Sequence, residues 1–269
     1  MVEIFDNIRK LYNFSGPCPE LADFIEFFSE SSPAATSRHA ANECFTVKMF
    51  PSWTPTIWIN LGAPYHLVTG KDCHMIRPTD DVLVLRDAIV TRYNQPSDHI
   101  FTVKFFPGGL ERILGITQVK FISQVVALKN IMPETLIQQV KTAASFEQRM
   151  ALLQQYFLLN YARKKRKDHY IQLVKDSIDL YHGGSMQYNT GETAEKMFVT
   201  SKTINRYFNN IIGISPKKYF SILRARTALT AYVANKKAFV PCDYGYYDMS
   251  HFYKDVVKFT GKKLSAYHC

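Results

Sequence analysis

The sequence is poor in cysteine and has no long apolar run. Its five cysteines are odd in number and widely spaced over 269 residues, and no two of them form a C-x-x-C pair. This spacing argues against a disulfide framework or a structural zinc site and is typical of reduced thiols in a cytoplasm. No apolar run approaches the ~20 residues of a membrane helix, and the first ten residues lack the pattern of a signal peptide. We therefore expect a soluble, cytoplasmic protein that does not enter a membrane.

Motifs of catalysis and of nucleotide binding are also missing. The run Pro107-Gly108-Gly109 lacks the G-x-G-x-x-G and Walker spacings, so we interpret it as a turn that leads into a helical turn. No spacing of a Ser/His/Asp triad or of paired catalytic carboxylates is recognisable. Cys73-His74 would point to opposite faces of a strand, which favours a hydrogen-bonded sheet histidine over a metal ligand. We predict no enzyme activity, no cofactor and no metal site.

Positive charge is concentrated in the last two-fifths of the chain. Residues 163–269 have 19 Lys and Arg against 8 Asp and Glu, a net charge of +11, whereas residues 1–162 have 14 against 15. The run Arg163–Lys167 lies at the boundary between the two parts and is either a solvated linker or a phosphate contact. A basic part beside a neutral one indicates a module for a polyanion joined to something else.

The first 162 residues show mixed patterns. We expect a short helix over Cys18–Ser29 and a loop over Ser31–Thr36. From about Glu43 to Ile116, short runs rich in Val, Ile, Phe, Trp and Tyr alternate with turn residues, which predicts an antiparallel sandwich or small barrel. Pro133–Tyr161 has helical spacing. Aromatic residues such as Trp53, Trp58 and Tyr65 either wall a ligand cavity or belong to the core, which is the commoner case.

The stretch Thr200–Ile212 has two contrasting faces at helical spacing. Its apolar residues form one buried stripe, made of Ile204, Tyr207, Phe208, Ile211 and Ile212. Its other face carries Lys202, Asn205, Arg206 and Asn209 and no acidic group. Lys and Arg suit guanine edges and phosphates, and Asn suits adenine. Thr200 or Ser201 is suited to cap this helix. The stretch is therefore either a DNA recognition helix or an ordinary amphipathic helix, and its surroundings decide between them.

The surrounding segments predict two helix-turn-helix units. We expect helices over Asp168–Tyr181 and Thr190–Val199 before the recognition stretch, then Gly213 as its end, a linker helix from Ser215 to about Asn235, and a second unit over Val240–Tyr247 and Asp248–Thr260. Ala194 and Met197 are expected to face inward. The last helix is expected to expose Met249, Ser250, Tyr253, Lys254 and Val257. The whole chain thus predicts an α+β fold with a β-rich domain over 1–162 and an all-α double helix-turn-helix domain over 163–269.

About 100 residues, from Asp168 to Tyr267, resemble the AraC/XylS family of bacterial transcription regulators. The first unit matches the family pattern at fixed spacing through Ala194, Met197, Thr200, Ile204, Arg206, Phe208, Gly213, Ser215, Pro216 and Tyr219. The linker helix carries Arg224 and Arg226, as in the family. The second unit matches through Gly245, Tyr246, Asp248, Ser250, Phe252, Gly261 and Tyr267. More faintly, the stretch at Trp58–Tyr65 and the FFPGG motif resemble a β-rich domain that often precedes such units.

The resemblance implies a regulator that places two recognition helices in successive major-groove segments of double-stranded DNA. It implies base contacts from Lys202, Asn205 and Arg206 in the first unit and from Met249, Ser250, Tyr253 and Lys254 in the second. Asn209, on the same polar face as the first three, is also expected to contact DNA. Thr200 and Ser201, at a helix start, would hold phosphate. The N-terminal domain would bind a small-molecule effector or form a homodimer.

Some residues depart from the family pattern. Pro241 lacks an N–H, so the first helix of the second unit has to start there or be distorted. Val256 stands in place of Phe, and Lys263-Leu264 in place of Ser-Pro. These departures affect the DNA contacts of the second unit more than its fold.

An enzymatic N-terminal half fused to the same DNA-binding module is the alternative. Repair methyltransferases of that plan use a Pro-Cys-His-Arg motif. Here the two Pro-Cys pairs, at Cys18 and Cys242, are followed by Pro19 and Asp243, so neither fits.

Overall fold

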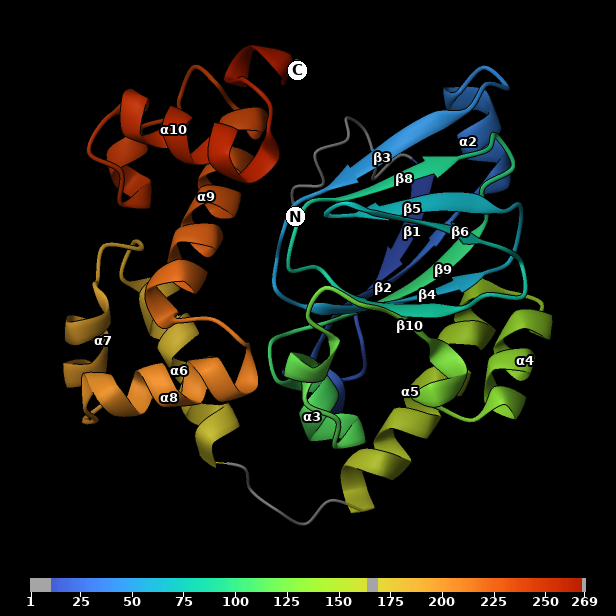
Figure 1. Ribbon diagram of the computed structural model, residues 1–269, viewed down its shortest axis with the longest axis horizontal. Coiled ribbons are helices and arrows are strands. Elements are labelled where there is room, and N and C mark those ends of the chain that lie inside the picture. Colours follow the sequence, from blue (N-terminus) through green and yellow to red (C-terminus); the bar gives the residue numbers. More distant parts are fainter. Residues whose placement is uncertain (1–10, 164–168, 268–269) are drawn as a thin grey trace. The chain divides into compact units, whose positions relative to one another are not determined.

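A computed structural model describes residues 11–163 and 169–267. Contacts divide this part of the chain into two compact units. One contains residues 11–48 and 53–163, and the other contains residues 169–267 together with Met49–Ser52. The first is built mainly of strands and the second of helices, and each is described by itself (Figure 1).

The β unit contains two antiparallel sheets. The larger has the strand order β1-β2-β9-β4-β7-β10, and the smaller has the order β3-β8-β5-β6. Figure 1 shows the smaller sheet lying over the larger one, which confirms the predicted sandwich. The strands are β1 (Tyr12–Ser15), β2 (Ile25–Ser31), β3 (Phe45–Met49), β4 (Pro55–Asn60), β5 (Tyr65–Thr69), β6 (Asp72–Ile76), β7 (Val82–Leu85), β8 (Val90–Asn94), β9 (Ile100–Phe105) and β10 (Val125–Ala127).

Helices cover the outer face of the larger sheet. They are α4 (Glu134–Thr142) and α5 (Phe146–Arg163), and Phe157 of α5 packs edge-on against Phe105 of β9 with ring centres 5.7 Å apart. Strands β4 and β9 are therefore buried on both faces, and every residue of both strands is buried. A third helix, α3 (Gly109–Leu114), follows the Pro-Gly-Gly turn as expected.

Two predictions for the start of the chain are wrong. Cys18–Ser29 is not a helix, because a short 3-10 turn at Pro19–Leu21 is followed by β2, which pairs with β1 and β9. Leu21, Ile25 and Phe28 are buried as expected, but their spacing fits a turn and a strand as well as a helix. The expected loop is partly helix α2 (Pro33–His39), which Ser32 caps and Pro33 begins.

The helical unit follows the predicted order. Helix α6 (His169–Gly183) precedes α7 (Thr190–Lys196) and α8 (Ser201–Ile211), and α9 (Pro216–Ala234) connects them to a 3-10 turn (Pro241–Tyr244) and α10 (Met249–Thr260). Its core contains a stacked pair, Tyr181 of α6 on Phe220 of α9, with ring centres 4.1 Å apart. Across the described ranges, 11–163 and 169–267, no helix has the length and apolarity to cross a membrane.

Candidate nucleic-acid interface

Helix α8 is anchored by its cap and by its apolar face. The hydroxyl of Thr200 accepts a hydrogen bond of 3.1 Å from the backbone N–H three residues on, so Thr200 rather than Ser201 is the cap. Ile204, Phe208 and Ile211 are fully or almost fully buried. Phe208 meets two rings of α9, with centres 5.4 and 6.0 Å away. Packing therefore fixes the residue types on the inner face of the helix, whereas it does not constrain those on the outer face.

The outer face of α8 carries the residues that the sequence predicted for base contact. Lys202, Arg206 and Asn209 are exposed, and Asn205 is partly exposed. The amides of Asn205 and Asn209 donate to backbone oxygens one turn earlier, at 2.8 and 2.7 Å. The guanidinium of Arg206 lies 5.0 Å from the ring centre of Tyr207. All four side chains lie on one face, but three of them are held by contacts within α8 and have to turn outward to reach a ligand.

The prediction that Tyr207 is buried is wrong. Tyr207 is only partly exposed to solvent rather than buried, and its ring lies 5.9 Å from that of His169 and 6.0 Å from that of Tyr170 in α6. It lies at the edge between the two faces, where a ring can pack on one side and support Arg206 on the other.

The turn between α7 and α8 is short and tightly bonded. Asn189 and Glu192 form a capping box at the start of α7. The N–H groups of Phe198 and Val199 bond back to α7 at 3.0 Å each. Phe198 adopts a left-handed backbone with φ 54° and is 96% exposed. Met197, expected to face inward, is partly exposed.

The connection to α9 follows the predicted signals. Gly213, with φ 99°, ends α8, and its N–H bonds to the backbone oxygen of Phe208 at 3.1 Å. The hydroxyl of Ser215 then caps α9, and Pro216 is its first residue.

The second unit has only a short first helix. A 3-10 helix starts at Pro241, as the missing N–H predicted, and Gly245 ends it with φ 70°. The carboxylate of Asp248 caps α10 by accepting from the N–H of His251 at 2.7 Å. Four side chains predicted for this unit are exposed on α10: Met249, Ser250, Tyr253 and Lys254.

One joint holds the two helix-turn-helix units together. Arg224 of α9 donates to the backbone oxygen of Gly245 and to the carboxylate of Asp255, both at 3.1 Å, and stacks 4.4 Å from the ring centre of Tyr246. Burial raises the pKa of Tyr246. A Cβ atom on Gly245 would lie 2.5 Å from the backbone oxygen of Met186 in the first unit. The backbone of one unit thus touches that of the other.

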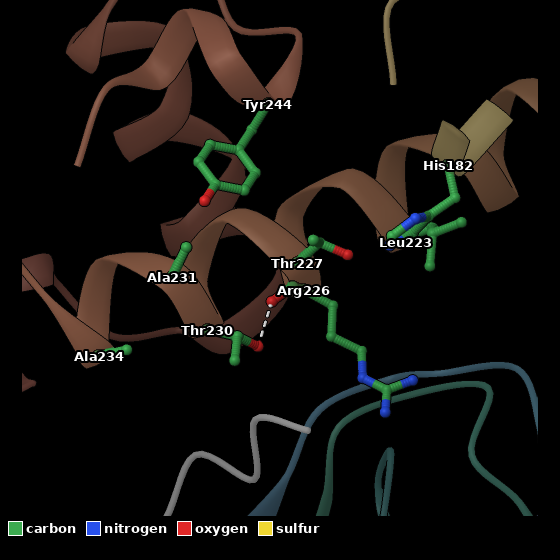
Figure 2. A pocket seen from close by; sticks show the side chains of 8 residues that line it. All are labelled: His182, Leu223, Arg226, Thr227, Thr230, Ala231, Ala234 and Tyr244. Carbon is green, nitrogen blue, oxygen red and sulfur yellow. Dashed lines mark hydrogen bonds between the residues drawn. The ribbon is translucent and has the colours of Figure 1, made fainter. Parts of the chain in front are cut away.

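A hollow of about 430 Å³ lies along α9 (Figure 2). Helix α9 supplies Leu223, Arg226, Thr227, Thr230, Ala231 and Ala234 to its lining, and His182 and Tyr244 line it from other elements. The hydroxyl of Thr230 donates to the backbone oxygen of Arg226 at 2.8 Å. None of the predicted base-reading residues lines this hollow.

The interior of the sandwich contains a polar cluster that the sequence prediction missed. Arg92 is 3% exposed, donates to the hydroxyl of Tyr12 at 2.8 Å, and lies 5.4 Å and 5.6 Å from the ring centres of Trp58 and Tyr65. Asn94 lies on the same inward side of β8. The signal was the alternation of β8, where every second residue from Val90 points inward, so Arg92 and Asn94 were inward positions.

Several polar atoms of this cluster are orphaned. Among the described residues, Nε and Nη1 of Arg92, the amide of Asn94, the hydroxyl of Tyr65 and Oδ2 of Asp98 have no hydrogen-bond partner. Burial raises the pKa of Asp98 and of Tyr65. Each unsatisfied buried polar group lowers stability by about 1–3 kcal/mol. A small polar molecule that bonded to these donors and acceptors would remove that cost.

The cysteine and histidine residues of the β unit show no common site. Cys18, Cys44 and Cys73 of this unit have free thiols, as has Cys242 of the helical unit. Within residues 11–163 and 169–267, no three His, Cys, Asp or Glu side chains are grouped closely enough to hold a metal ion. His99 instead pairs with Glu30 at 2.8 Å, which also accepts from Arg149.

Comparison with known proteins gives a likeness of fold. A 1.65 Å structure of ToxT from Vibrio cholerae matches with a TM-score of 0.50 and 10% identity, over 84% of this chain and 97% of that one. ToxT from Vibrio cholerae O395 matches with a TM-score of 0.50 and 11% identity, over 84% and 93%. The chain therefore shares the fold of ToxT. The AraC-like transcriptional activator CuxR reaches a TM-score of only 0.30, at 9% identity over 88% and 92%, and adds no weight. No protein-family model and no curated protein matches the sequence.

The architecture shared with ToxT, a β-rich part followed by a helical part, confirms the predicted fold class. The assignment of base and phosphate contacts to individual residues stays a prediction. Of the basic run at 163–167, Lys164, Lys165, Arg166 and Lys167 lie outside the described residues.

Proposed function

We propose that this chain is a transcription regulator that binds double-stranded DNA in a sequence-specific manner. Helices α8 and α10 enter successive major-groove segments, about one helical turn or ~34 Å apart. The domain over 163–269 binds DNA, and the domain over 1–162 senses a small molecule or mediates dimerisation.

The outer face of α8 carries this proposal. Lys202, Asn205, Arg206 and Asn209 are all on that face, exposed or partly exposed, with no acidic side chain among them. Guanidinium and carboxamide groups match the edges of guanine and adenine in the major groove. An ordinary amphipathic helix has no reason to exclude acidic residues there.

The distribution of charge supports the same function. Residues 163–269 hold the whole excess of positive charge, and each neutralised phosphate releases counterions and favours binding. Thr200 and Ser201 lie at the start of α8, where backbone N–H groups suit a phosphate.

The decisive experiment is selection of binding sites from a random duplex library, followed by titration of variants. Arg206→Ala is expected to weaken binding to the selected site by about 1–3 kcal/mol and to relax the preference at one base pair. The reason is that a guanidinium can bind guanine through two hydrogen bonds at once.

Arg206→Lys is the matched control, because it keeps the charge and loses the bidentate geometry. It should retain most of the non-specific affinity and lose the base preference. If Arg206→Ala binds with unchanged affinity and selectivity, α8 is not a recognition helix.

We further propose that the N-terminal domain binds a small molecule with an acidic group between its sheets. Arg92 carries this proposal, because its guanidinium is buried and two of its nitrogens are unpartnered among the described residues. A carboxylate would accept a charge-assisted hydrogen bond from one of these nitrogens, and a second acceptor would bind the other, because Nε–H and Nη1–H point to different sides of the guanidinium. Asn94 and the hydroxyl of Tyr65 would bind neighbouring polar groups of the same molecule.

This effector proposal is tested by thermal shift of the full chain with butanoate, octanoate and benzoate, each compared with its neutral carboxamide. A ligand that binds only the folded protein stabilises it by mass action, by about 2.7 kcal/mol at a hundredfold excess over Kd. Acids should raise Tm, amides should not, and Arg92→Met should abolish the difference. Arg92→Lys, which keeps a buried charge, checks that a lost shift is not a folding defect. Equal shifts for acids and amides, or none, would leave dimerisation as the role of this domain.

A further inference from the structure

The two recognition helices can be compared position by position, because both caps are fixed by hydrogen bonds. Thr200 caps α8 and Asp248 caps α10. Counted from these caps, the outward positions correspond in the following pairs: Lys202 with Ser250, Asn205 with Tyr253, Arg206 with Lys254, and Asn209 with Val257. Both carboxamides of α8 are thus replaced by apolar groups in α10, one aromatic and one aliphatic.

These apolar side chains of α10 do not serve the core. Tyr253 is 37% exposed and Met249, just after the cap, is 43% exposed. Val257 is partly exposed. The core face of the same helix is formed by Phe252 and Val256, which are fully buried. Burial therefore does not explain why Tyr253 and Met249 are apolar.

The chemistry of the major groove offers a partner for such groups. Asn recognises adenine through a pair of hydrogen bonds to its base edge. Neither Val nor the ring of Tyr can form this pair. The apolar feature exposed in this groove is the C5-methyl group of thymine. We infer that α10 reads thymine methyl groups through Tyr253, Met249 and Val257, whereas α8 reads base edges by hydrogen bonds. This inference rests on the proposed function.

The neighbouring residues favour DNA over a protein partner as the occupant of this face. Lys254 and Ser250 are interleaved with the apolar groups on α10 and are exposed, and these side chains suit phosphate oxygens. Lys254 occupies the position of Arg206, so both helices carry a cation at this position. This face of α10 thus combines a cation that suits a phosphate with apolar side chains that suit thymine methyl groups.

The test uses the selected duplex and replaces thymine by uracil, which removes only the methyl group. The half-site read by α8 is identified first, as the one whose base preference relaxes in Asn205→Ala. Uracil in the other half-site should weaken binding about fourfold for each contacted methyl, the value expected for one buried methyl-sized group. Uracil in the half-site of α8 should leave the affinity within twofold.

Variants at an exposed position locate the contact without disturbing the fold. Tyr253→Ala should bind thymine and uracil duplexes alike, because the ring that covers the methyl is gone. Tyr253→Phe keeps the ring and should keep the discrimination, which separates apolar contact from a hydrogen bond of the hydroxyl.

The outcomes separate this inference from the proposed function. If the chain selects a DNA site but uracil has no effect in either half, or the same effect in both, the inference is overturned and α10 is free for a protein partner. If no site is selected at all, it is the proposed function that fails.

Discussion

In this structure Arg206 contacts the adjacent residue, Tyr207, of the same helix. Its guanidinium lies over the ring of Tyr207, and the amides of Asn205 and Asn209 bond to the backbone of their own helix. Residue type and helical spacing were enough to predict these groups and their shared face. Their internal contacts depend on rotamers, which sequence spacing does not encode.

Asp98 shows how a buried group links stability to pH. It is 2% exposed, and burial raises its pKa above the ordinary value, although Arg92 and Ser31 act in the opposite direction. Because the folded pKa is raised, its favourable contribution is complete below the unfolded pKa and is lost as pH rises through the folded pKa.

Asp98→Asn, which cannot ionise, is therefore expected to gain stability relative to the wild type as pH rises from about 4 to 8. Each unit of raised pKa corresponds to about 1.4 kcal/mol. The measurement is urea unfolding of both proteins across this range. A difference that stays constant, or that favours the wild type at high pH, would show that Asp98 is not destabilised by its charge.

At the scale of elements, a Ser-Pro pair starts two helices, and the sequence analysis recognised only one of them. Ser215-Pro216 correctly predicted the start of α9, and Ser32-Pro33 begins α2 in the same way. The second signal was missed because the surrounding residues are typical of a loop. At β2, the competing helical spacing of Ile25 and Phe28 misled the prediction, because pairing with β1 and β9 decides that segment.

Gly245 gives a test of the joint between the two helix-turn-helix units. Its backbone is left-handed, and a Cβ atom would meet the backbone of Met186. Gly245→Ala is therefore expected to lower the free energy of unfolding by about 1–3 kcal/mol and to weaken DNA binding, because Asp248, the cap of α10, lies three residues later. Unfolding and DNA titration measure the two effects.

Gly183→Ala is the matched control for this substitution. Gly183 ends α6, and an added Cβ would meet no atom within 4 Å. Alanine there should be neutral or stabilise by up to about 1 kcal/mol. Equal effects of the two substitutions would show that the contact at Met186 does not matter.

At the scale of the whole molecule, one half carries the charge and the other carries the sandwich. The net charge of +11 over residues 163–269 was readable from composition, and ToxT shares the fold of this chain at 10% identity.

The sequence by itself determined the order of helices in the helical half, with a cap at Thr200 or Ser201, a cap at Ser215 and the end of α8 at Gly213. These features depend on neighbours within a few residues, where φ, ψ and capping act. Only the tertiary structure decided that Cys18–Ser29 contributes a strand, that Arg92 is buried among aromatic rings, and that Arg224 joins the two units. These features depend on contacts between residues 20 to 80 positions apart in the sequence. Local residue spacing does not predict such contacts.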